Sequence, residues 1–264
     1  MPVFLAVVMS GEQRNEPQRL LQLIQQRAGV SRRKAQALIA SGEVALNGAP
    51  ETNPFAQVNV TNMRSLTLRG HPLALEPPEP RIYRYHKPRD VLCSHDDRFD
   101  GNTVGRILRA EGFMGYTWAG RLDRDAEGLL LVTNEGGLVQ VFTHPSHQVR
   151  KVYRVWVKHL PKADVMRRTF EHMRSGVADD EDILRILAGR VEGRPAYATV
   201  TLTEGRKHEV KRLFAHFGLP VVRLLRVAIG PVDLGELPAG KIARLSPAEE
   251  EAVLTFARSR LDGN

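Results

Sequence analysis

Apolar residues in the first part of this chain recur at helical spacing up to about residue 42. Two short helices are predicted there, the first ending near Gly29 and the second running from an N-cap at Ser31 to Gly42. Strands are expected at 43–46, 58–60 and 66–68, with a tight hairpin turn at Asn47-Gly48. The buried helix faces should consist of Leu20, Leu21, Leu23, Ile24, Ala35, Leu38 and Ile39.

Beyond residue 80 the pattern switches repeatedly between strand and helix spacing. Strands are expected at 82–85, 91–93, 129–132, 149–157 and 196–203, and helices at 138–142, 161–176 and 208–218. The helix at 161–176 should bury the stripe Val165, Met166, Phe170 and Met173. The pattern predicts an α+β protein, but alternation alone leaves the sheet topology open.

Residues 76–80, EPPEP, mark a stiff joint because proline restricts the backbone. We therefore expect a leader at 1–16, a first domain at 17–76, a linker at 77–82 and a second domain at 83–264. The first ten residues are apolar but few, and they contain no basic residue. They predict neither a membrane span nor a signal peptide.

Composition narrows the class of partner. The 264 residues include 38 Lys+Arg against 30 Asp+Glu, a net charge of +8, which favours an anionic partner such as a nucleic acid backbone. The single cysteine, Cys93, excludes an intramolecular disulfide framework and fits a reducing, cytoplasmic setting. The nine histidines show no metal-binding spacing with cysteine, so no metal site is expected.

The stretch 120–134, GRLDRDAEGLLLVTN, turns abruptly from charged to apolar. Its apolar half predicts a buried strand, whereas unpaired charges are costly to desolvate and place the first half in a loop. A loop mounted on a rigid strand is a common place for a reactive side chain. Asp123 is therefore a candidate catalytic carboxylate. A surface loop with a structural Arg–Asp pair is the alternative for an isolated R-L-D tripeptide.

Five separated segments together resemble the RNA pseudouridine synthases that modify ribosomal RNA and carry an S4 RNA-binding domain. They are 120–134, K-P at 87–88, K-x-Y at 151–153, EGRKHEVKRLF at 204–214 and PVVRLLRVAIGPV at 220–232. The resemblance implies that Asp123 is the catalytic nucleophile. The chain departs from the family at Ala126, where Thr or Ser is common, and at Asp90, where the first motif usually has Gly.

The resemblance also implies roles for other residues. It places Tyr153 against the target base, where an aromatic plane can stack, although a Tyr in a buried strand face is the alternative. It pairs Lys211 with Asp123, so that a cation keeps the carboxylate ionised, although a solvated helix face would also explain this lysine. Further substrate contacts are expected at Arg121, Leu224, Arg206, Lys87 and Arg226. An ordinary loop lysine explains Lys87 equally well.

The helix–helix–strand–turn order at 18–48 is similar to the S4 fold, with Arg32, Arg33 and Lys34 in the first turn of its second helix. Cations oppose the helix dipole at that position, a penalty that a bound phosphate would offset. We expect RNA contact there; a solvated basic face is the alternative.

The resemblance implies a small S4-like module followed by a domain with a large, mainly antiparallel mixed sheet and flanking helices. The implied reaction converts uridine in ribosomal RNA to pseudouridine, with large-subunit RNA favoured over small-subunit RNA. No metal or organic cofactor, no membrane and a monomeric state are expected. The alternative is a non-catalytic S4-type RNA-binding or ribosome-assembly protein, which the departures at Ala126 and Asp90 would suit.

Overall fold

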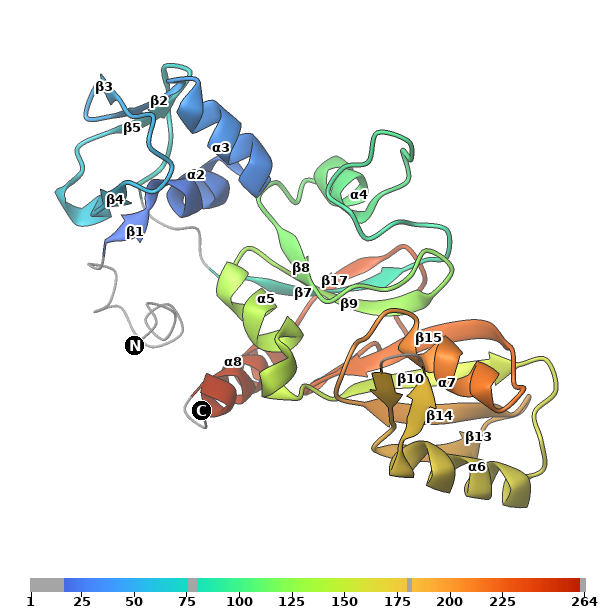
Figure 1. Cartoon of the computed structure of the whole chain (residues 1–264). Coiled ribbons are helices and arrows are strands. Elements are labelled where there is room, and N and C mark those ends of the chain that lie inside the picture. Colours follow the sequence, from blue (N-terminus) through green and yellow to red (C-terminus); the bar gives the residue numbers. More distant parts are fainter. Residues whose placement is uncertain (1–16, 76–79, 180–181, 262–264) are drawn as a thin grey trace.

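The computed structural model describes residues 17–75, 80–179 and 182–261, and shows a small N-terminal module beside a larger body built on one wide sheet (Figure 1). The module contains β1 (Gln18–Arg19), α2 (Leu20–Ala28), α3 (Arg32–Ala40), β2 (Val44–Leu46), β3 (Ala49–Pro50), β4 (Gln57–Val58), the 3-10 helix η2 (Val60–Asn62), β5 (Leu66–Leu68) and β6 (His71–Pro72). The predicted leader and most of the EPPEP joint lie outside the described residues. The division into domains therefore stays a prediction.

Single residues end or begin the helices of the module, as predicted. Helix α2 ends at Gly29, whose φ of 63° lies in the left-handed region that glycine adopts at little cost. The Ser31 hydroxyl accepts a hydrogen bond from the backbone N–H of Lys34 at 3.2 Å and caps α3. Asn47 and Gly48 both take positive φ, and they form the hairpin turn between β2 and β3.

The module buries a core of its own between its two helices and its strands. This core consists of Leu20, Leu21, Leu23, Ile24, Ala35, Ile39, Val44, Val58 and Leu66. The strand expected at 58–60 is shorter than predicted, because the chain leaves β4 after Val58 and turns into η2. The other predicted elements of the module are confirmed.

The second part of the chain forms a nine-stranded sheet with the path β13-β14-β10-β15-β9-β7-β17, to which β8 and β16 attach. Its strands are β7 (Ile82–Lys87), β8 (Thr117–Ala119), β9 (Glu127–Thr133), β10 (Lys151–Val157), β13 (Ala188–Glu192), β14 (Tyr197–Leu202), β15 (Val221–Ile229), β16 (Val232–Asp233) and β17 (Ile242–Arg244). All pairings are antiparallel except β15 with β9. The expected mainly antiparallel mixed sheet is thus confirmed.

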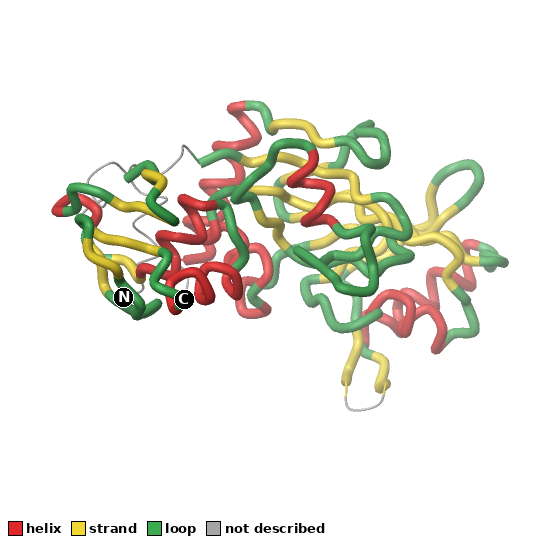
Figure 2. Tube along the Cα trace, turned by 90° about the horizontal axis from the view of Figure 1, so that it is seen from above, coloured by secondary structure: helices red, strands yellow, loops and turns green. Residues whose placement is uncertain are grey.

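Helices cover both faces of this sheet, and the strands run through the middle of the molecule (Figure 2). The helices are α4 (Val104–Ala110), α5 (Gly136–Thr143), α6 (Ala163–Ser175), α7 (Glu209–His216) and α8 (Pro247–Leu261), with a short 3-10 helix η3 (Pro145–His147). Helices α4, α6 and α7 pack into one core, and α5 and α8 pack into a second core on the opposite face. A separate hairpin of β11 (Val177–Asp179) and β12 (Asp182–Leu184) follows α6.

Two local predictions for this part are wrong. Residues 91–93 form no strand and contribute only one bridge, between Leu92 and Thr103, because the chain turns there toward α4. Val165 is 40% exposed, whereas the other three residues of its predicted stripe are buried. In the part of the chain that the structure describes, no helix is both long and apolar enough to cross a membrane.

Candidate active site

The charged half of the 120–134 stretch forms the loop between β8 and β9, which we call the catalytic loop (residues 120–126). All seven residues of β9 are buried, so the loop emerges from the centre of the sheet. A backbone hydrogen bond from Ala126 N to Asp123 O, at 3.1 Å, closes the loop into a tight turn. Ala126 is itself buried in the core, so that this turn forms without the hydroxyl that the resembled family commonly has there.

Two basic side chains from the start of α7 face the Asp123 carboxylate, which is 32% exposed. Lys211 Nζ lies 3.5 Å from Oδ2, and His208 Nε2 lies 3.5 Å from Oδ1. Lys211 makes a closer contact with Asp125, and this hydrogen bond lowers the pKa of Asp125. The predicted neighbours Asp123 and Lys211 are therefore brought together, but Lys211 is shared between two carboxylates.

An open cavity lies in front of Asp123. Its walls come from the catalytic loop (Arg121, Leu122, Asp123 and Ala126), β10 (Tyr153), β14 (Leu202), the segment before α7 (Glu204, Gly205, Arg206 and His208), the first turn of α7 (Glu209 and Val210) and β15 (Leu224). Apolar side chains thus meet one carboxylate and several basic groups. This arrangement suits a flat, partly polar ring.

Lys87 lies beneath the catalytic loop and is fully buried. Its ammonium donates hydrogen bonds to the carbonyl oxygens of Pro88 (2.9 Å), Arg124 (3.3 Å) and Ala126 (2.8 Å). Burial lowers the pKa of Lys87 to about 8, because a desolvated ammonium is disfavoured. The structure therefore places Lys87 as a support of the loop and away from the surface where it was expected to meet a phosphate.

Arg226 supports the loop from the other side. It is only 1% exposed, and its Nε donates to Leu129 O at 2.8 Å while Nη1 donates to Arg121 O at 3.2 Å. Arg226 was expected to contact the substrate, but in the structure its side chain is buried. The parallel pairing of β15 with β9 places the Arg226 guanidinium beneath the end of β9 at which the catalytic loop joins this strand.

The turn after the K-P motif adds two further contacts to the catalytic loop. Asp90 adopts φ 62° in place of the usual glycine, a conformation that Asp tolerates better than most residues, and its N–H donates to Arg124 O at 2.8 Å. Cys93 Sγ accepts the backbone N–H of Leu122 at 3.4 Å. The departure at Asp90 thus leaves the expected turn in place.

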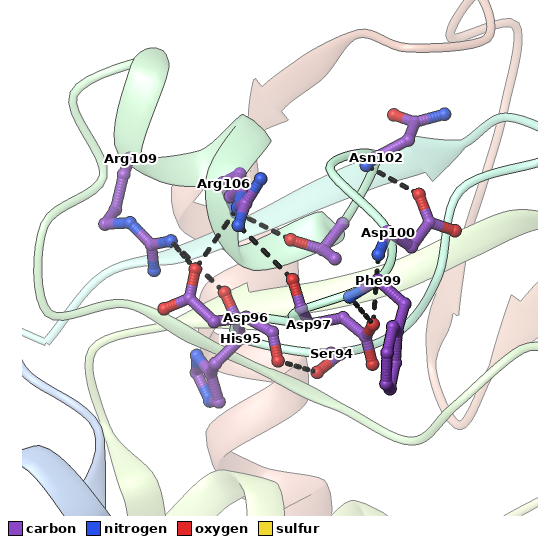
Figure 3. Close-up of polar contacts among 10 residues, drawn as sticks. Ser94, His95, Asp96, Asp97, Phe99, Asp100, Asn102, Arg106 and Arg109 are labelled. Carbon is purple, nitrogen blue, oxygen red and sulfur yellow. Dashed lines mark hydrogen bonds and ion pairs between the residues drawn. The ribbon is translucent and has the colours of Figure 1, made fainter.

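A second loop, residues 94–102, is held in shape by its own acidic side chains (Figure 3). Asp96 is bound by Arg109 at 2.6 Å. Arg124 of the catalytic loop pairs with Asp100 at 3.0 Å. The loop exposes Phe99 to 84%, with the Arg98 guanidinium 4.4 Å from the ring centroid. The sequence pattern gave no indication of this shaped loop.

Arg206 lines the cavity, but carboxylates engage its guanidinium. Its Nε contacts Glu204 at 2.6 Å and its Nη1 contacts Asp182, and both interactions raise the pKa of Arg206. Glu209 accepts the Arg206 backbone N–H at 3.0 Å, and burial raises the pKa of this carboxyl group. The segment before α7 is thus fixed by polar contacts on the floor of the cavity.

The structure gathers five of the predicted residues around one cavity: Arg121, Asp123, Tyr153, Arg206 and Leu224. The triplet Arg32, Arg33 and Lys34 lies apart from it, exposed on the first turn of α3. Sequence reasoning missed His208, which is the N-cap residue of α7, three residues before Lys211. Among the described residues, no group of three His, Cys, Asp or Glu side chains is placed to hold a metal ion.

Comparison with known proteins gives consistent matches. The profile of a family described as RNA pseudouridylate synthase matches residues 81–216. The chain is 32% identical to a ribosomal small subunit pseudouridine synthase A of Vibrio cholerae, over 85% of this chain and 94% of the relative. It is 35% identical to a ribosomal large subunit pseudouridine synthase B of Yersinia pestis, over 83% of this chain and 70% of the relative. A solved pseudouridylate synthase superimposes with a TM-score of 0.59 at 27% identity, covering 89% of this chain and 99% of that one.

Proposed function

The chain belongs to the RNA pseudouridine synthase family, and from that premise we propose that it converts uridine in ribosomal RNA to pseudouridine, with Asp123 as the reactive group. The single observation that carries this proposal is the Asp123 carboxylate, which lines an open cavity and lies beside two basic side chains. Matching relatives are named for the small and for the large ribosomal subunit. The preference for large-subunit RNA stays a prediction.

Asp123 begins the reaction in either of two ways. It attacks the sugar as a nucleophile or removes a sugar proton, and in both routes the N-glycosidic bond breaks and the base returns through carbon. The carboxylate must be ionised for either step. Lys211 and His208 are placed to stabilise that negative charge. The reaction is an isomerisation that needs no redox partner.

The uridine must leave its stack before a side chain can reach the glycosidic bond. Tyr153 on β10 and Leu224 on β15 both line the cavity and supply an aromatic and an apolar wall for the extruded ring. Arg121, at the entrance of the catalytic loop, is exposed and meets the RNA backbone. The exposed Phe99 beside this loop offers a further surface for a neighbouring base.

Lys87 and Arg226 act in this proposal as positioning residues. Their buried side chains donate to carbonyl oxygens on both sides of Asp123 and hold the loop in one conformation. The exposed Arg32, Arg33 and Lys34 of the N-terminal module bind RNA phosphates away from the reaction centre. We further propose that the protein works as a monomer in the cytoplasm, where ribosomal RNA is made and modified.

Asp123→Asn tests the proposal, with Asp125→Asn as the matched control. Both changes remove one charge from the same loop and from the surroundings of Lys211, but only Asp123 lines the cavity. We expect Asp123→Asn to bind ribosomal RNA and form no pseudouridine by mass spectrometry, and Asp125→Asn to keep at least a tenth of the rate. Pseudouridine formation by Asp123→Asn at the wild-type rate would refute the assignment. Absence of product with the wild-type protein would favour a non-catalytic RNA-binding protein.

A further inference from the structure

The face of the sheet opposite the cavity carries a row of two aromatic side chains flanked by arginines. On β10, Tyr153 faces the cavity, so its neighbours Arg154 and Trp156 point to the other face. This is the face that α5 and α8 cover farther along the sheet, and Trp156 packs against the edge of their core. Beyond Trp156, toward β14 and β13, arginine side chains stay exposed.

The row crosses three strands. Arg223 on β15 pairs in register with Trp156 on β10, and its guanidinium carbon lies 4.5 Å from the Trp156 ring centroid. The Trp156 and Tyr197 rings follow, with centroids 5.0 Å apart. Arg154 then lies over Tyr197 at 5.3 Å. Two aromatic planes are thus held between two guanidinium groups on a rigid sheet.

Positive charge exceeds negative charge around this row. Arg190 on β13 pairs in register with Thr199, which in turn pairs with Arg154. The nearby carboxylates are Glu192, which is bound by Arg190 and Thr199, and Glu127, which is bound by Arg223. The three guanidinium groups of Arg154, Arg190 and Arg223 outnumber these two carboxylates, so the surface is net positive. In the described part of the chain, Arg154 forms no ion pair closer than 4.0 Å.

We propose that this sheet face, defined by Arg154, Trp156, Arg190, Tyr197 and Arg223, binds a single-stranded segment of the RNA substrate that flanks the modified nucleotide. Aromatic planes on a sheet stack with nucleobases of any sequence, and the surrounding arginines bind the phosphates and stack in turn. The arginines of this face outnumber its carboxylates, so a polyanion complements it. The proposal rests on the proposed function for the identity of the RNA.

The two faces of the sheet imply a dependence on RNA length. The cavity and the Trp156 row lie on opposite sides of β10, so a minimal stem-loop that fills the cavity leaves the row empty. A longer ribosomal RNA fragment reaches both. Changes in the row should therefore weaken binding of the long fragment and spare both binding and conversion of the short one.

Tryptophan fluorescence gives a direct test in the full-length protein. The chain has two tryptophans, and Trp118 is 8% exposed in the core, so Trp118→Phe leaves Trp156 as the reporter. We expect a ten-nucleotide oligouridylate to quench Trp156 emission saturably, with weaker binding at higher salt. The double change Arg154→Glu and Arg190→Glu should weaken this binding at least tenfold, and Trp156→Ala should weaken binding of the long ribosomal fragment roughly five- to a hundredfold in a filter assay.

A matched control distinguishes a specific effect of this row from a general effect of net charge on RNA binding. Arg167 and Arg168 on α6 are exposed, and α6 packs on the other face of the sheet. Arg167→Glu with Arg168→Glu makes the same charge change and should weaken oligouridylate binding less than threefold. Equal losses in both double variants, or no quenching of Trp156, would overturn the proposal. If the wild-type protein forms pseudouridine but oligouridylate does not quench Trp156, only this inference is refuted. If Trp156 is quenched but no pseudouridine forms, the proposed function is refuted. Thermal unfolding checks that each variant is folded.

Discussion

Gly128→Ala should disrupt the junction between the catalytic loop and the core. Gly128 has φ 117°, a value that residues with a side chain rarely adopt, and it pairs with Arg226 in the only parallel step of the large sheet described. A Cβ atom there would lie 2.3 Å from Arg226 O and 2.6 Å from Arg226 N. Both neighbours are backbone atoms, so β9 and β15 must move apart by about 1 Å to reach ordinary contact.

The cost has two parts. The unfavourable φ costs about 1–3 kcal/mol, and the forced separation of a packed core costs about 1–3 kcal/mol more. A destabilisation of about 2–6 kcal/mol lowers the melting temperature of a protein of this size by roughly 4–24 °C. Pseudouridine formation should fall as well, because Arg226 holds Arg121 O and Leu129 O on either side of Asp123.

Thermal unfolding followed by circular dichroism measures the effect, and Gly136→Ala is the control. A Cβ at Gly136 meets nothing within 4 Å, and the residue begins α5. Alanine favours a helix over glycine by up to about 1 kcal/mol, so this variant should melt at or slightly above the wild-type temperature. A Gly128→Ala protein that melted within about 2 °C of wild type, with full activity, would refute the role given to this junction.

Three further predictions address single side chains. Lys211→Met should lower the rate of pseudouridine formation more than RNA affinity, because its ammonium faces Asp123; equal losses in single-turnover and filter-binding assays would indicate a backbone contact. The pKa of Lys87 is about 8 in the folded protein, whereas an unperturbed lysine has a pKa of 10.5. Above pH 8 the unfolded chain therefore keeps a proton that the folded chain has lost. Stability should rise from pH 8 to 10.5 by up to about 1.4 kcal/mol per pH unit from this group, and urea titrations of Lys87→Met should lack that part of the rise. Ser31→Ala should destabilise the N-terminal module by about 1 kcal/mol, since the Lys34 N–H loses its acceptor, while Ser31→Asp should restore the cap.

The amino-acid sequence determined the local features by itself. The apolar run at 129–132 predicted a buried strand, because no loop could shelter four such side chains from water. Ser31, Gly29 and the Asn47-Gly48 pair predicted helix ends and a turn, because each interaction joins residues a few positions apart. The strand expected at 149–157 is likewise confirmed as β10 (Lys151–Val157).

Only the tertiary structure decided which side chains meet around Asp123 and which are buried beneath it. The K-P motif alone does not show whether Lys87 binds a phosphate or donates to backbone carbonyl groups. In the folded protein Lys87 is buried under the catalytic loop and donates to three carbonyl oxygens. Arg226 was expected on the rim, but the parallel step between β9 and β15 put it in the interior. The physical reason is the separation of the interacting residues along the chain. Hydrophobic spacing and helix capping involve residues a few positions apart, whereas contacts between residues about a hundred positions apart depend on the order of the strands in the sheet.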